Sequence, residues 1–151
     1  MESFAELVLG FFQDQDWPVA EIEPGELFET AFEGEHGVWP CRVHCYETDR
    51  RLVFISAFAG IVPDELRPAM AELCNRANFG LAVGNFELDH DGGEVRFRTS
   101  LDATEASADA ELVRNVVVAN VLTFDQYLPA IEAVLNGTGP ADAIEDVEEE
   151  E

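Results

Sequence analysis

The sequence predicts an α+β domain: one antiparallel sheet of about five strands with helices packed on it, in the order α-βββ-α-ββ-α. Three observations support this fold class. Residues 3–15 repeat apolar side chains at helical spacing, residues 27–59 alternate with the period of strands, and residues 85–98 form two short strand patterns around an Asp-Gly turn. The length of 151 residues is that of one domain, which we expect over residues 1–144, with an acidic disordered tail over residues 145–151.

The first helix and the strands after it have clear sequence signals. Ser3 and Glu6 have the spacing of a capping box, and Trp17-Pro18 ends the helix because the residue before a proline is pushed out of the α region. The three strand patterns that follow predict an antiparallel meander. They cover Leu27–Glu33, Val38–Glu47 and Leu52–Ala59.

Two further helices are predicted from their ends. Pro63 and the acidic residues after it open the second helix, and Asp109 starts the longest one. Pro129 lies inside the long helix and should kink it or split it in two. Gly137 is a good C-cap, and Pro140 should prevent the helix from continuing.

The residues around the Asp-Gly turn predict the register of a β-hairpin. We place Asp91 and Gly92 at the centre of a type I′ turn, which needs φ > 0 at both positions. The cross-strand pairs are then Phe86 with Phe97, Leu88 with Val95, Glu87 with Arg96, and Asn85 with Arg98. A slip of one residue would set Phe86 against Arg98, so the side-chain pattern favours this register.

The charge of the chain narrows its possible partners. It has 32 acidic residues and eight basic ones, all arginine, which gives a net charge of −24. Direct binding to nucleic acid or to an anionic membrane is therefore disfavoured. Two explanations of the acidity stay open: a solvated surface adapted to high salt or to solubility, which the absence of lysine favours, and an acidic face that recognises a cationic or apolar polypeptide.

The sequence also indicates a cytoplasmic location. The N-terminus lacks the basic region of a secretory signal, and no apolar stretch approaches the length of a membrane span. Three cysteines, an odd number, are typical of reduced thiols. We expect a cytoplasmic protein.

No catalytic, cofactor or metal site is predicted, and we do not expect an enzyme. Cys41, His44 and Cys45 resemble a ligand set, but on a strand the two cysteines lie about 13 Å apart at ~3.3 Å per residue. His44 points to the opposite face of that strand, so the three cannot bind one zinc ion as a local unit. His36 and His90 have no serine or cysteine nucleophile at a recognisable motif spacing.

Two polar or small residues in apolar surroundings are candidates for contacts. Gly84 lies inside a predicted strand, where a glycine marks a bulge or the close approach of another backbone. Asn120 lies on the apolar stripe of the long helix, where it would set the register of a helix pair or bond a nearby backbone group.

The hairpin and the segments beside it contain a characteristic set of residues. The set includes Asn75 and Asn78, Gly84-Asn85-Phe86-Glu87-Leu88-Asp89 and Val95-Arg96-Phe97-Arg98, and it continues in Tyr127-Leu128, Ile131, Gly137, Pro140 and Ala143-Ile144. With these residues the chain resembles the YbjN family of bacterial sensory transduction regulators. The resemblance implies a fold similar to that of type III secretion chaperones, small acidic dimers that hold a partner polypeptide extended against their surface.

Two functional hypotheses follow. The first is a non-enzymatic protein-binding module, a chaperone-like or regulatory adaptor that acts as a homodimer on an unidentified protein or peptide. Its candidate contact residues are Val83, Gly84, Asn85, Val117, Asn120 and Phe124, with core packing as the alternative for those on the helix. The second is a small-ligand or anion sensor, or an enzyme, with a pocket between sheet and helices in which Arg96 and Arg98 grip an anion. Cross-strand pairing with Glu87 and Asn85 already explains both arginines.

Overall fold

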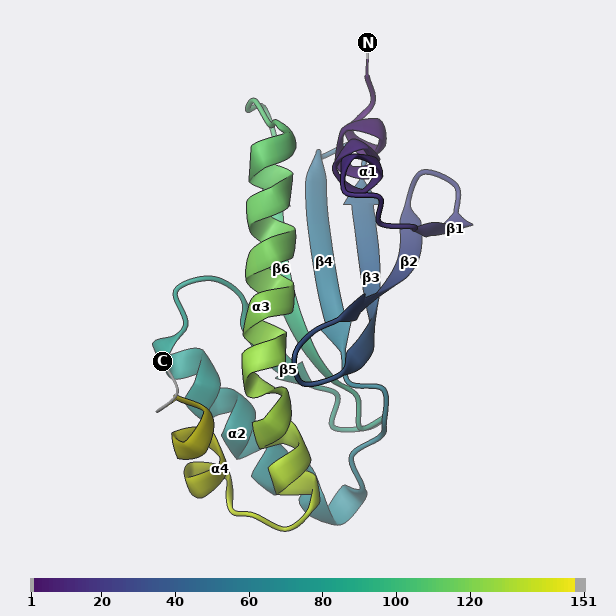
Figure 1. The fold of residues 1–151 in the computed structure, drawn as a ribbon. Helices are drawn as coiled ribbons and strands as arrows, with labels where there is room; N and C mark the ends of the chain where they lie inside the picture. The colour runs from purple at the N-terminus through teal and green to yellow at the C-terminus, as the bar shows by residue number, and fades with distance from the viewer. Residues whose placement is uncertain (1, 149–151) are drawn as a thin grey trace.

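The computed structural model describes residues 2–148, and these form one antiparallel sheet with helices packed against it (Figure 1). The helices are α1 (Phe4–Asp14), α2 (Arg67–Gly80), α3 (Ala110–Leu135) and α4 (Pro140–Glu148), with a 3-10 turn, η1 (Asp64–Leu66), before α2. The strands are β1 (Ala20–Glu23), β2 (Leu27–Glu33), β3 (Val38–Tyr46), β4 (Arg51–Ala57), β5 (Asn85–Leu88) and β6 (Val95–Asp102). They lie in the order β1-β2-β3-β4-β6-β5. The predicted α+β class is confirmed, with one strand more than expected.

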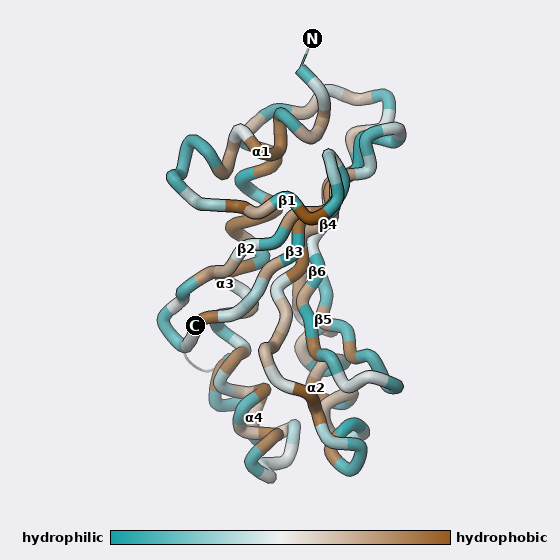
Figure 2. The backbone as a smooth tube through the Cα atoms, turned by 90° about the vertical axis from the view of Figure 1, so that its right-hand side faces the viewer, coloured by the Kyte–Doolittle hydropathy of each residue, from teal (hydrophilic) through white to brown (hydrophobic). Residues whose placement is uncertain are grey.

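The helices cover one face of the sheet and leave the other open. Figure 1 shows α1 and α3 crossing the same face, and in Figure 2 α1, α3 and α4 lie on one side of β3, β4 and β6. Side chains of β3 that point toward the helices are buried: Trp39, Cys41, Val43 and Cys45. Arg42 and His44, between them, are only half-buried on the open face, as the alternating sequence predicts.

The predicted cap of α1 is present, and a second group reinforces it. The Ser3 hydroxyl accepts a hydrogen bond from the Glu6 amide at 3.0 Å. From the end of β3, the Glu47 carboxylate accepts bonds from the Phe4 and Ala5 amides at 2.8 and 3.1 Å. The N-terminus of α1 is thereby fixed to the sheet, because these amides have no partner inside the helix.

Two elements were not predicted. Strand β1 is short, lies between Pro18 and Pro24, and exposes all four of its side chains, so it has no alternating pattern to detect. Helix α4 occupies residues 140–148, so the predicted disordered tail is wrong for residues 145–148; residues 149–151 lie outside the described residues. The long helix does end before Pro140, as predicted, but Pro140 also begins this separate helix, since proline fits the first turn. Ile144 and Val147 of α4 are buried against the domain.

Helix α3 is continuous through Pro129, so the expected split does not occur. Asp109 caps its start by accepting from the Leu112 amide at 3.0 Å, as predicted. At its end Gly137 adopts φ +100°, and its amide and that of Thr138 donate to carbonyls of the last turn at 3.1 and 2.9 Å. This is a Schellman motif, which confirms the predicted C-cap.

The hairpin has the predicted register but a different turn. All four predicted pairs are present, including Phe86 opposite Phe97, whose ring centroids lie 4.6 Å apart. The turn is longer than type I′: the Asp89 carbonyl accepts from the Gly93 amide at 2.7 Å, and Gly93 is the residue with positive φ, +81°. A Cβ at Gly93 would overlap the Val62 carbonyl oxygen, so glycine is required there rather than at Gly92.

Candidate functional site

The predicted contact residues on the long helix lie inside the domain. Val117, Asn120 and Phe124 are fully buried, because the apolar stripe of α3 packs against the sheet. A contact role for these three on the surface is therefore wrong, and the alternative of core packing holds. Val83 is 55% exposed in the loop before β5, and Gly84 and Asn85 are half-buried, so a contact role for these three stays a prediction.

Asn120 joins α3 to the centre of the sheet. Its amide nitrogen donates to the carbonyl oxygens of Phe54 and Phe97 at 2.9 and 3.0 Å, and its Oδ1 accepts from the Ser56 hydroxyl at 2.6 Å. The Trp39 indole N–H completes the network by donating to Ser56 at 2.9 Å. Asn120 thus bonds nearby backbone groups, and it sets the position of a helix on a sheet rather than of two helices.

Gly84 approaches another strand of its own chain. Its φ is +81°, and a Cβ there would lie 2.8 Å from the Arg98 carbonyl oxygen and 2.7 Å from the Phe97 ring. The predicted close backbone approach is present, and it is intramolecular. Glycine is required here to let the chain enter β5 directly beside β6.

The edge of the sheet at β5 is closed by one side chain. The Asn78 amide group donates to the Phe86 carbonyl at 3.1 Å and accepts from the Phe86 amide at 2.6 Å. These are the two bonds that a neighbouring strand would make with Phe86. Because α2 also packs beside β5, this edge offers little to an added strand.

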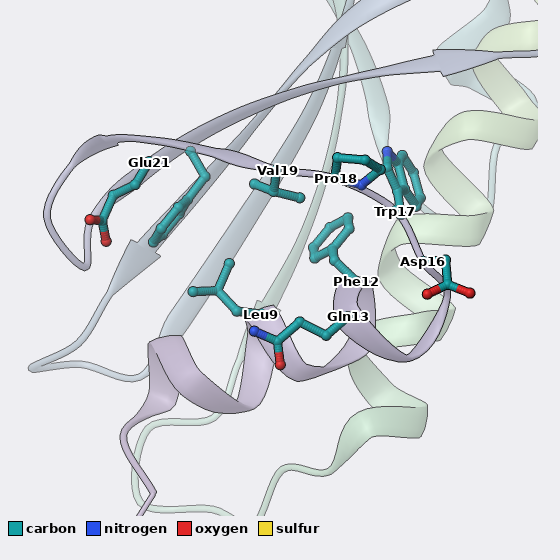
Figure 3. Close-up of a pocket in the computed structure, with 9 residues that line it drawn as sticks. Leu9, Phe12, Gln13, Asp16, Trp17, Pro18, Val19 and Glu21 are labelled. Carbon is teal, nitrogen blue, oxygen red and sulfur yellow. The ribbon is translucent and has the colours of Figure 1, made fainter.

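The opposite edge carries the main candidate site, a groove between α1 and β1. Figure 3 shows Leu9, Phe12 and Gln13 pointing up from α1 toward the segment that contains Trp17 and Val19. The cavity has a volume of about 590 Å³. Its lining is mostly apolar: Leu9, Phe12, Trp17, Pro18, Val19 and Phe28, with Gln13, Asp16 and Glu21 at the rim.

The wall of this groove is held in place by hydrogen bonds and ring contacts. The Trp17 indole N–H donates to the Ala31 carbonyl at 3.0 Å, and the Thr30 hydroxyl donates to the Pro18 carbonyl at 2.7 Å. The Trp17 ring packs edge-on against Phe12 with centroids 5.0 Å apart. The groove is therefore preformed, and an occupant would not have to organise it.

Both the rim and the neighbouring strand are acidic, and the strand edge is free. The charged residues that line the groove, Asp16 and Glu21, are both acidic, and Glu23 and Glu26 follow along β1 and its turn. Among the described residues, β1 pairs only with β2, and its four side chains are exposed. Its outer backbone groups are available to another strand.

Arg96 and Arg98 do not form an open anion site, because both are ion-paired on the open face of the sheet. Arg96 Nε lies 2.7 Å from Glu87 Oε1, and Arg98 Nε lies 3.2 Å from Glu87 Oε2. Arg42 makes a bidentate pair with Glu94 at 3.0 and 2.9 Å. The predicted cross-strand pairing of Arg96 with Glu87 is present, and Arg98 shares the same carboxylate instead of bonding Asn85.

The cysteines and His44 show no activated chemistry. Burial raises the pKa of the Cys41, Cys45 and Cys74 thiols to about 12, so they stay protonated near neutral pH. Burial and the nearby charge of Arg42 lower the pKa of His44, which keeps its imidazole neutral at pH 7.

Glu35, His36 and Asp125 bring three possible metal ligands together, but their contacts describe a structural clamp. Asp125 Oδ2 and Oδ1 accept from the backbone amides of Glu35 and His36 at 3.0 and 2.9 Å. His36 Nδ1 lies 3.0 Å from the Asp125 carbonyl oxygen and donates to it. Pro129 lacks an N–H, so it cannot supply the i→i−4 bond that this carbonyl would normally accept. The cluster ties the β2–β3 turn to α3.

The groove residues were not identified from the sequence. One signal was available in α1. Its apolar stripe is marked in the sequence by Phe4, Leu7, Val8, Phe11 and Phe12, and Leu9 is an apolar residue outside that stripe. Nothing local says that residues 17–19 fold back over it, because that path depends on β1, which the sequence does not reveal.

Comparison with known proteins defines the class of this fold. YbjN from E. coli, described as "a putative transcription regulator", superposes with a TM-score of 0.59 at 13% identity, covering 80% of this chain and 85% of that one. The HopA1–SchA chaperone–effector complex superposes with a TM-score of 0.51 at 13% identity, covering 80% of this chain and 88% of that one. The ExsC–ExsE complex superposes with a TM-score of 0.52 at 14% identity, covering 82% of this chain and 88% of that one. The predicted type III secretion chaperone-like fold is confirmed.

The family model named YbjN, described as "Putative bacterial sensory transduction regulator", matches residues 5–133. The chain therefore belongs to the YbjN family, as the resemblance of its hairpin predicts. No curated protein sequence matches the chain. Within the part of the chain that the structure describes, no helix is both long and apolar enough to cross a bilayer.

Proposed function

We propose that the protein is a non-enzymatic binding module of the cytoplasm, a chaperone-like or regulatory adaptor that acts as a homodimer and holds an extended segment of another protein. One observation carries the proposal: a preformed apolar groove of about 590 Å³ lies directly beside the free edge of β1. The family and the structural neighbours are described as regulators and chaperones, which supports the same class of function.

The groove and the edge together match the needs of an added strand. An extended segment would satisfy the outer backbone groups of β1 with its own main chain, which gives affinity without sequence preference. Every second side chain of that segment would then point toward α1, where Leu9, Trp17 and Val19 offer apolar contacts. The groove should therefore bind segments in which every second residue is apolar.

The acidic rim predicts the chemistry of the other side chains. Asp16 and Glu21 line the groove, Glu23 follows along β1, and the whole chain has a net charge of −24. A segment with basic residues at its solvent-facing positions would be attracted during encounter, and salt would weaken that attraction. The HopA1–SchA chaperone–effector complex and the ExsC–ExsE complex, which have similar folds, support a role in binding another protein.

Fluorescence anisotropy with three labelled ten-residue peptides tests the proposal. The first alternates valine with arginine, the second replaces valine by serine, and the third replaces arginine by glutamate. We expect the first to bind most tightly, the second to bind weakly through charge alone, and the third not to bind. Equal affinity of the first two peptides would contradict a role for the apolar groove.

A matched pair of variants locates the binding. Leu9→Glu places a carboxylate in the groove, whereas Leu122→Glu adds the same charge at a 60% exposed position on α3 outside it. We expect Leu9→Glu to abolish binding of the first peptide and Leu122→Glu to leave it unchanged, with similar thermal unfolding for both. Loss of binding in both variants would show a non-specific charge effect.

A further inference from the structure

The most exposed large hydrophobic side chain of the described residues is Phe79, near the end of α2. It is 95% exposed, whereas the next, Ile61, is 64% exposed. An aromatic ring held in water at the end of a helix is unusual in a folded domain and is typical of a contact surface. It is not needed for the closure of the neighbouring sheet edge, which Asn78 provides.

A hollow of about 400 Å³ lies beside this ring, between α2 and α4. Its walls come from Glu72, Asn75, Arg76 and Phe79 on α2 and from Ile144 and Glu148 on α4. The protruding ring and the hollow therefore belong to one continuous patch. A surface that carries both a knob and a hole next to each other can pair with a copy of itself across a two-fold axis.

The charges of the patch are also self-complementary. Arg76 is the basic residue among those that line the hollow, and its Nε lies 2.8 Å from Glu72 Oε2 in an exposed pair one helical turn away. Across a two-fold axis, Arg76 of each copy can exchange this partner for Glu72 of the other copy. In a chain with eight arginines and a net charge of −24, a cation at the contact offsets part of the repulsion between two copies.

We propose that the α2–α4 surface binds a second copy of this chain, with Phe79 of each copy inserted into the hollow of the other. The inference rests on the proposed homodimer and adds the surface that forms it. Helix α2 packs beside β5, and β1 is at the opposite edge of the sheet, so this arrangement leaves both peptide grooves free at the outer ends of the dimer.

Sedimentation equilibrium of the full chain over a range of concentrations tests the surface. We expect Phe79→Ser to weaken dimerisation by about tenfold or more, since a central aromatic contact dominates such an interface. Leu122→Ser removes an exposed apolar side chain of α3 away from the patch and should leave dimerisation unchanged. Thermal unfolding should not separate the two variants, because both positions are exposed.

A charge exchange provides a second, independent readout. Arg76→Glu should weaken the dimer, and the double variant Glu72→Arg with Arg76→Glu should restore it, because the exchange keeps every pair within and between copies. A monomeric wild type at all concentrations would overturn both the homodimer and this surface. A wild-type dimer unaffected by Phe79→Ser and by Arg76→Glu would overturn this surface and leave the homodimer, and peptide binding in the groove is measured separately.

Discussion

The two edges of the sheet are treated in opposite ways. At β5, the Asn78 side chain bonds both backbone groups of Phe86, α2 packs alongside, and Gly84 lets the strand begin tightly against β6. At β1, four exposed residues present an unpaired backbone beside an apolar groove. A free edge invites aggregation, and proteins normally block it. Closing one edge while leaving the other open directs strand addition to a single place.

The largest expected effect comes from placing a larger side chain in the tight space at the start of β5. Gly84→Val would force a β-branched residue into φ +81° and against the Arg98 carbonyl oxygen, so we expect a loss of about 3 kcal/mol in the free energy of unfolding. Urea denaturation measures this. Gly80→Ala, four residues earlier in α2 and with nothing near its Cβ, should be neutral or slightly stabilising; equal losses in both would refute the steric explanation.

Removing the side chain that closes the β5 edge should remove the difference between the edges. Asn78→Ala leaves the Phe86 amide and carbonyl without partners, with an expected cost of about 2 kcal/mol. We also expect new concentration-dependent association, measured by light scattering. Asn78→Asp keeps the acceptor for the Phe86 amide, so its stability should fall between those of the wild type and Asn78→Ala. An unchanged scattering profile for Asn78→Ala would mean that α2 alone closes this edge.

A smaller effect is expected at the open edge. Thr30→Val removes the bond to the Pro18 carbonyl, which should cost about 1 kcal/mol and weaken peptide binding a few-fold by loosening the groove wall. Thr104→Val removes a similar bond to the Asp49 carbonyl, and neither of these residues lines the groove. It should cost as much stability without changing peptide affinity. Equal effects of both variants on affinity would show that the wall does not need this bond.

The smallest effect concerns the ion pairs that tie β5 to β6. Partial burial opposes the charge of Glu87, but the Arg96 hydrogen bond and the Arg98 charge outweigh it, so the pKa of Glu87 is lowered. The carboxylate therefore adds stability above its unfolded-state pKa, and this is lost as pH falls through the lower folded-state pKa. Denaturation of wild type and Glu87→Gln from pH 7 to pH 3 should show the two converging in acid. A difference that persists there would point to packing.

The sequence was most informative where neighbouring side chains constrain each other. The hairpin register was predicted correctly from the pairing of Phe86 with Phe97 and Glu87 with Arg96, because register depends on the alternation along both strands. The predicted turn type was wrong, because the turn depends only on which glycine takes positive φ. The apolar stripe of α3 was also recognised. A stripe says that a face is buried but not against what, so Phe124 was placed on a contact surface and belongs to the core.

The open edge and the last helix were missed for the opposite reason. Strand β1 buries none of its side chains, so its place in the sheet comes from backbone bonds that leave no mark in the sequence. Pro140 fits a helix start as well as a helix stop, and only the packing of Ile144 and Val147 decides between them. The groove depends on β1 and was therefore beyond prediction, as was the side-chain bond of Asn78 to Phe86.

The clamp between His36 and α3 has a consequence for the folding pathway. Pro129 cannot donate the i→i−4 bond to the Asp125 carbonyl, and the imidazole that bonds this carbonyl comes from a turn 89 residues earlier in the chain. The helix cannot complete its hydrogen bonding by local growth. This carbonyl of the helix gains its His36 partner only when the β2–β3 hairpin docks. We therefore expect the contact to tie completion of the helix to a long-range step and to make folding slower and more cooperative.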